Sequence, residues 1–255
     1  MPRWGHMGGI KHLRSVGEAL QFMRCTSQGL RTLHENRIVH RDISEWNMMV
    51  NYYNPYSPKY PRHLIDGCRS PSDVHYCLLD FDISRIFPRD VPTQACRRPS
   101  VESYEGTPIY HPLETSCGEH DYDPFAYDVG SLGNLYKINL SSMVPTVPLL
   151  APLFDKMTTY AVAERFTAAE AADFLEAAIA SLPESARDTP VSLRCDWECF
   201  VHPDLYWART TAEFRDRWAH FRAPRLPWIS SLLMRLLESE RGWPVLCFVR
   251  RTLRV

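Results

Sequence analysis

A chain of 255 residues, 45% of them hydrophobic, is long enough to bury a substantial core, so the sequence predicts a globular protein. The net charge of −1 gives no general attraction to nucleic acid or to an anionic membrane, and we expect neither as a partner. The eight cysteines include no Cys-x-x-Cys pair and follow no secretory signal, which argues against a disulfide framework or a zinc site and predicts an intracellular, cytoplasmic protein.

The first half of the chain predicts a helix followed by a polar loop between two short strands. Residues 1–10 have no periodic pattern and predict a loop. Apolar side chains then recur at helical spacing from Ser15 to His34. The apolar pairs and triplets at 38–39 and 48–50 predict short buried strands, which would hold the His, Arg, Asp and Asn side chains of residues 40–47 in a site.

The next elements alternate between irregular loops and short ordered stretches. Residues 51–73 contain four prolines without periodicity and predict an inserted surface loop. A short strand over 75–79 ends in an Asp-Phe-Asp triplet at 80–82. Farther on, Thr167 and Glu170 have the spacing of a capping box and predict the start of a helix.

The last part of the chain, residues 181–255, predicts a C-terminal extension whose role the sequence does not indicate. Its tryptophans are interleaved with arginines but form no basic stripe, which favours core packing over nucleic-acid binding. The apolar residues of 229–237 form one face of a helix that we expect to pack on its own domain. The apolar run at 244–249 is too short to span a bilayer, so no transmembrane segment is expected.

Four motifs occur in one order along the chain, and turn chemistry alone does not explain that order. They are His40-Arg41-Asp42 with Asn47, the triplet Asp80-Phe81-Asp82, the segment from Gly106 to Glu114, and the run from Asp128 to Gly133. Together they resemble the C-terminal lobe of eukaryotic protein kinases, in the protein kinase-like superfamily, over residues 1–180. Within that superfamily the chain looks most similar to protein kinase domain-containing proteins of basidiomycete fungi.

The resemblance implies an α+β fold, predominantly helical, that lacks most of the N-terminal β-rich lobe, because no glycine-rich loop or lysine strand precedes the first helix. It implies ATP-dependent phosphoryl transfer to a protein hydroxyl group, with Ser or Thr preferred to Tyr. ATP and Mg²⁺ would be the cofactors, and the expected partner is a protein substrate or a docking partner.

The resemblance also implies roles for individual residues. Asp42 would be the catalytic base, while Asn47 and Asp80 would hold Mg²⁺ against the nucleotide. Arg41 would brace the loop or meet a phosphorylated residue of the activation segment, where Ser100, Ser103 and Tyr104 are candidate acceptors.

Two structural contacts follow from the same resemblance. Asp128 would be a buried carboxylate that braces the backbone of residues 40–47. Arg165 would form an ion pair with Glu114, and the loss of either partner would leave a buried charge unpaired.

Two departures from the pattern keep other functions open. Ser44 stands where a phosphate-facing lysine is usual, and Asp82 replaces a glycine. The chain is therefore expected to be either part of a protein kinase that needs a complete N-terminal lobe for activity, or a non-catalytic, pseudokinase-type binding module. A third alternative is a small-molecule phosphotransferase of the aminoglycoside-kinase type, which shares the His-x-Asp and Asp-x-Asp patterns. The segments 106–114 and 128–133 argue against it.

Overall fold

A computed structural model describes most of the chain. It covers residues 4–7, 10–51, 74–117 and 119–224, together with residues 242, 244, 245, 248 and 252. The predicted inserted loop therefore lies outside the described residues except for Asn51, and so does the predicted apolar helix face at 229–237.

The described fold is mixed α/β and mostly helical, as expected for the α+β class. The α-helices are α1 (Val16–Glu35), α3 (Pro124–Leu140), α4 (Leu150–Thr158), α5 (Ala168–Ala180), α6 (Glu184–Arg187), α7 (Trp197–Val201), α8 (Asp204–Trp207) and α9 (Ala212–Arg217). Single-turn 3₁₀ helices include η2 (Glu45–Asn47), η4 (Ser100–Tyr104), η5 (Pro108–Tyr110), η6 (Leu113–Cys117) and η8 (Val162–Glu164). None of the described helices has both the length and the apolar composition that a bilayer crossing requires.

The strands are short and form small antiparallel sheets. They are β1 (Gly5–His6), β2 (Ile38–Val39), β3 (Met48–Val50), β4 (Tyr76–Leu78), β5 (Arg85–Ile86), β6 (Arg98–Pro99) and β7 (Asp121–Tyr122). The order β1-β3-β4 makes one sheet, and the pairs β2-β5 and β6-β7 make two more. The prediction of a loop over residues 1–10 is wrong at β1, because a two-residue strand is too short to show alternation and pairs through its backbone alone.

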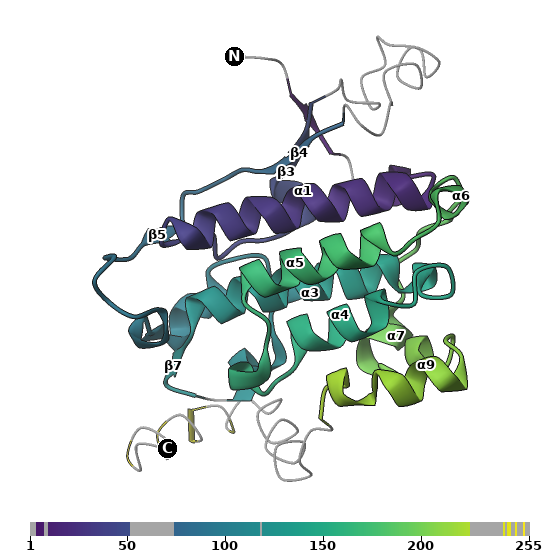
Figure 1. Ribbon diagram of the computed structural model, residues 1–255. Coiled ribbons are helices and arrows are strands. Elements are labelled where there is room, and N and C mark those ends of the chain that lie inside the picture. Colours follow the sequence, from purple (N-terminus) through teal and green to yellow (C-terminus); the bar gives the residue numbers. More distant parts are fainter. Residues whose placement is uncertain are drawn as a thin grey trace.

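Helix α3 is the centre of the fold. Its residues are all buried except Ala126, so other elements must cover it on every side. Helices α1, α4 and α7 pack against it, and α5 packs against both α1 and α4. Figure 1 shows α1 and α5 side by side, with α3 and α4 on the other side of α5 and α7 at one end.

The predicted starts of helices α1 and α5 are confirmed. Ser15 caps α1, where its hydroxyl accepts a hydrogen bond from the Glu18 N–H. Thr167 and Glu170 form the predicted capping box at the start of α5. These caps satisfy backbone donors that a helix start leaves without partners, so both helices begin at defined residues.

The described part of the C-terminal extension shares the core of the bundle. Cys199, Tyr206 and Trp207 are buried in the same hydrophobic cluster as α3 and α4. Main-chain hydrogen bonds join the two parts as well, since the Val16 N–H donates to Thr189 and the Asp196 N–H donates to Ile138. Residues 181–224 therefore complete the core rather than trail from it.

Candidate active site

The site loop, which we define as residues 40–47, is anchored at both ends by strands. Before the loop, Ile38 of β2 pairs with Ile86 of β5. After it, Met48 of β3 pairs with Leu78 of β4. Both predicted strands are confirmed. Because each end belongs to a different sheet, the loop spans two fixed points and has little freedom to move as a whole.

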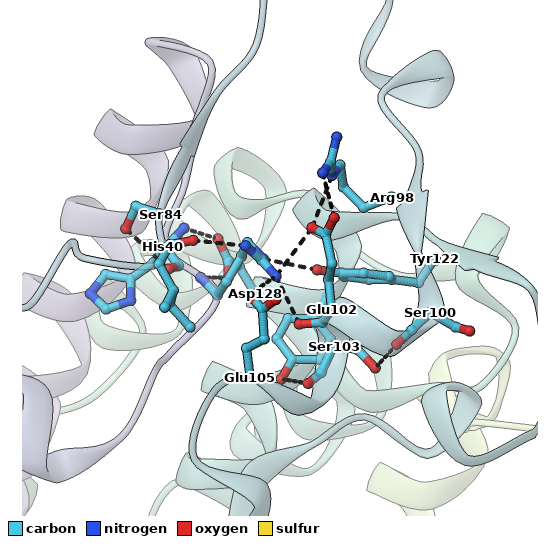
Figure 2. Close-up of polar contacts among 12 residues, drawn as sticks. His40, Ser84, Arg98, Ser100, Glu102, Ser103, Glu105, Tyr122 and Asp128 are labelled. Atoms are coloured by element: carbon cyan, nitrogen blue, oxygen red, sulfur yellow. Dashed lines mark hydrogen bonds and ion pairs between the residues drawn. The ribbon is translucent and has the colours of Figure 1, made fainter.

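A buried carboxylate from α3 fixes the backbone of the site loop. Asp128 is completely buried, and its two oxygen atoms accept hydrogen bonds from the N–H groups of His40 and Arg41, each at 2.7 Å. Figure 2 shows Asp128 beside His40. Hydrogen bonds to a charged acceptor are strong, especially away from water. The expectation that Asp128 braces this loop is confirmed.

Asp42 and Asn47 are hydrogen-bonded to each other across the site loop. The Asn47 Nδ2 atom donates to the Asp42 Oδ2 atom at 2.7 Å and to the Asp42 carbonyl at 2.9 Å. The Thr107 N–H donates to the other carboxylate oxygen, Oδ1, at 2.6 Å. The Asp42 carboxylate is therefore held in one orientation, and the Asn47 amide presents its carbonyl oxygen away from Asp42.

The main chain just before Asp80 is hydrogen-bonded to the site loop. Leu79, the residue before it, donates its N–H to the Asn47 carbonyl at 3.0 Å, and the Leu79 carbonyl lies 2.9 Å from Nε2 of His40. Asp80 is exposed and has a φ of 68°, while Arg41 has a φ of 71°. Residues other than glycine rarely adopt positive φ, and those that do are concentrated at functional sites.

The oxygen atoms of Asn47 and Asp80 suit magnesium, a hard cation that binds carboxylate and carbonyl ligands. Magnesium usually takes only one or two protein ligands and completes its shell with phosphate oxygens and water. In the described part of the chain, no group of three or more His, Cys, Asp and Glu side chains is arranged to hold a metal ion. Asn47 and Asp80 are therefore the residues of this site that could supply one or two protein ligands to such an ion.

Arg41 joins the site loop to a later segment of the chain. Its side chain is 1% exposed and donates to the Tyr122 hydroxyl at 3.0 Å and to the Ile83 carbonyl at 2.8 Å. It also donates to the Glu102 carbonyl at 2.7 Å and to the Glu105 carboxylate at 2.9 Å. These contacts match the bracing role that the sequence predicts for Arg41.

A second ion pair supports the site from outside. Arg165 and Glu114 form the predicted ion pair, which is bidentate, with nitrogen-to-oxygen distances of 2.6 and 2.7 Å. The Arg165 side chain is almost completely buried and also donates to the carbonyls of Ala126 and Thr159. Planar, paired hydrogen bonds of this kind fix the position of η6 relative to α3 and to the segment that follows η8.

Several buried polar atoms near the site have no hydrogen-bond partner among the described residues. They include the hydroxyl of Ser44, which is completely buried, Oε2 of Glu45 and Nε2 of His111. Burial lowers the pKa of His111, and a hydrogen bond with the Gly106 backbone and the charge of the Asp42 carboxylate oppose this only in part. The sequence analysis did not identify His111 or the Thr107 N–H as part of the site. A histidine within the 106–114 motif was the available signal for the first, whereas a backbone donor leaves no signal.

A scan of the chain against protein-family models finds no match, and a search of curated proteins finds none either. The evidence for function therefore comes from the arrangement of residues around Asp42 and from the order of the motifs.

Proposed function

We propose that the chain is a protein kinase-like protein that transfers the γ-phosphoryl group of ATP to a protein hydroxyl group, with Ser or Thr preferred to Tyr. One observation carries the proposal. The Asp42 carboxylate is hydrogen-bonded to Asn47 on a loop whose backbone is fixed by a buried carboxylate, Asp128. Phosphoryl transfer depends mainly on positioned groups and on charge neutralisation, and such a loop supplies the positioning. The resemblance of the motifs to the kinase C-terminal lobe supports the same proposal.

In the proposed reaction, Asp42 takes the proton of the substrate hydroxyl while the hydroxyl oxygen bonds to the γ-phosphorus and the bond to ADP breaks. Each oxygen of the Asp42 carboxylate has one donor, from Asn47 or from Thr107, so each keeps acceptor capacity for the substrate. Asn47 and Asp80 would hold a Mg²⁺ ion, which neutralises charge on the phosphates when bound.

The test is ATP binding and phosphate transfer by the full chain. Binding is measured as a thermal shift with ATP, with and without MgCl₂, and transfer as radiolabelled phosphate moved from ATP to dephosphorylated casein. We expect Asp42→Asn to lower transfer by about 10²–10⁴-fold with the thermal shift retained, because it removes only the base. Asp80→Asn should reduce the magnesium-dependent part of the shift.

The matched control is Asp90→Asn, since Asp90 is exposed and lies outside the site. It should leave both the shift and the transfer unchanged. The absence of any magnesium-dependent shift with ATP in the full chain would contradict the kinase proposal.

A non-catalytic, pseudokinase-type binding module is the second candidate, and Ser44 favours it. The resemblance places a phosphate-facing lysine at this position, whereas the Ser44 side chain is neutral and completely buried. A positive charge is therefore missing where negative charge accumulates during transfer. A magnesium-dependent shift with ATP but no transfer to casein would support this candidate and leave a docking partner as the ligand to identify.

A further inference from the structure

The charged segment, which we define as residues 98–107, lies against the site loop. It begins in β6, continues through η4, and ends at Thr107, whose N–H donates to the Asp42 carboxylate. Its backbone passes so close at Gly106 that a Cβ atom there would lie 2.5 Å from the Arg41 carbonyl and 3.1 Å from Oδ1 of Asp42. The position of this segment therefore determines one of the hydrogen bonds that orient Asp42.

Charge pairing at Arg41 holds the charged segment in place. The buried Arg41 guanidinium lies 2.9 Å from the Glu105 carboxylate and 3.3 Å from the Glu102 carboxylate. Arg98 also hydrogen-bonds to Glu102, and this lowers the pKa of that carboxyl group, so Glu102 stays ionised. Figure 2 shows Arg98, Glu102 and Tyr122 close together, with Glu105 below them. Two carboxylates thus balance two arginines.

Two hydroxyl groups of the charged segment, those of Ser103 and Tyr104, are already hydrogen-bonded within the fold. Ser103 is 1% exposed, and its hydroxyl donates to the Ser100 carbonyl at 2.7 Å. The Ser103 carbonyl accepts a hydrogen bond from the Tyr127 hydroxyl, and the Tyr104 hydroxyl donates to the Thr115 carbonyl at 2.7 Å. A phosphate on Ser103 would need space and water that this packing excludes.

We propose that Glu102 and Glu105 are positioning residues. Through Arg41 their carboxylates hold the charged segment against Asp42 in the unmodified chain, so the site is assembled without phosphorylation of this segment. The positioning of the charged segment is inferred from these contacts alone, whereas the effect of that positioning on phosphoryl transfer rests on the proposed function.

Hydrogen exchange of the full chain tests the positioning. The protein is treated with phosphatase, its unmodified mass is confirmed, and amide exchange is followed by mass spectrometry without nucleotide. The N–H groups of Ser100, Glu105 and Thr107 are the probes, because each donates a hydrogen bond in this arrangement. We expect them to be protected in the wild-type chain and to exchange at least about tenfold faster in Glu102→Gln/Glu105→Gln, which keeps the shape of both side chains but removes their charge.

The matched control is Glu164→Gln/Glu184→Gln, which removes two exposed carboxylates elsewhere. Protection of α3 in every variant shows that the chain has folded. If the double variant does not fold, Glu105→Gln alone is used, because the Glu105 side chain is 45% exposed and its loss is milder. Wild-type amides at 100–107 that exchange freely while α3 is protected, or that are equally protected without the two charges, would overturn the proposal.

Transfer kinetics give a second readout that a purely structural role would not move. We expect Glu102→Gln/Glu105→Gln to lower kcat by about tenfold with KM for ATP unchanged, because the orientation of Asp42 is affected and the magnesium ligands are not. An unchanged kcat in this variant would overturn the catalytic consequence. A wild-type chain that protects the segment but transfers no phosphate would contradict the proposed function and leave the positioning intact.

Discussion

Asp128 shows how one side chain determines the geometry of the site. Its carboxylate accepts two backbone N–H groups of the site loop and also lies 3.2 Å from the ring of His34 on α1. It therefore ties together α1, α3 and the loop. A loop residue with positive φ, as at Arg41, stores strain and persists only where its surroundings fix it.

Substitution of Asp128 should cost stability as well as activity. In Asp128→Asn one oxygen becomes an NH₂ group that faces a backbone N–H, so at least one strong hydrogen bond is lost and a donor is left without an acceptor. We expect the free energy of unfolding to fall by about 3 kcal/mol. Urea denaturation measures this value, with Asp90→Asn as the control that should change it by less than about 0.5 kcal/mol. Equal stabilities of the two variants would show that Asp128 does not brace the loop.

The contact of α3 with α4 depends on a glycine. A Cβ atom at Gly133 would lie 2.6 Å from Cβ of Met157 and 2.8 Å from Cγ2 of Thr158. The Met157 Cβ atom is fixed by the backbone, and the Thr158 side chain is held by the hydrogen bond from its hydroxyl to the Phe154 carbonyl. The two helices can approach this closely only because position 133 has no side chain.

Two glycine-to-alanine substitutions should therefore have opposite signs. Gly133→Ala overpacks the helix contact and should lower the free energy of unfolding by about 1–3 kcal/mol. Gly29→Ala in α1 has room, since only Cδ1 of Leu78 comes within 4.0 Å, and should raise it by about 0.5–1 kcal/mol. Thermal and urea unfolding of both variants measure these changes. A stabilising Gly133→Ala would mean that α3 and α4 are not in this contact.

On the scale of the whole molecule, a half-buried histidine near the site, His111, couples stability to pH. His111 is held in a packed environment with Nε2 unpartnered, and burial lowers its pKa in the folded chain. The unfolded chain therefore binds the proton more readily than the folded chain does. By linkage, this contribution to stability is complete above the unfolded pKa, near 6.5, and is lost as the pH falls toward the folded value.

Stability should accordingly fall as the pH drops below about 6.5. The loss attributable to His111 is about 1.4 kcal/mol for each unit between the unfolded and folded pKa. Urea denaturation at pH values of about 7.5, 6.5 and 5.5 measures the slope. His111→Gln should flatten it, whereas His202→Gln, at an exposed histidine, should not. A slope that is the same in wild type and in His111→Gln would show that protonation of His111 does not lower the stability of the folded chain.

The sequence by itself determined several of the elements and some of the contacts that hold them. Helix α1 follows from an apolar period of 3.6 residues, and the start of α5 follows from the pair Thr167 and Glu170, because both signals are local. The pairing of Arg165 with Glu114 and the bracing role of Asp128 were expected from the resemblance of the motifs to the kinase C-terminal lobe. Buried charges need specific partners, so motifs of this kind carry contacts along with residue types.

Only the tertiary structure decided how these elements meet around Asp42. The pairing of β1 with β3 and the hydrogen bond from Thr107 to Asp42 use backbone groups, which every residue has. No pattern of side chains in the sequence therefore predicts them. The burial of Ser44 results from many contacts between residues that are distant in the sequence, and so does the core that residues 181–224 share with α3. Packing of this kind depends on the complete three-dimensional arrangement, which no local stretch of sequence specifies.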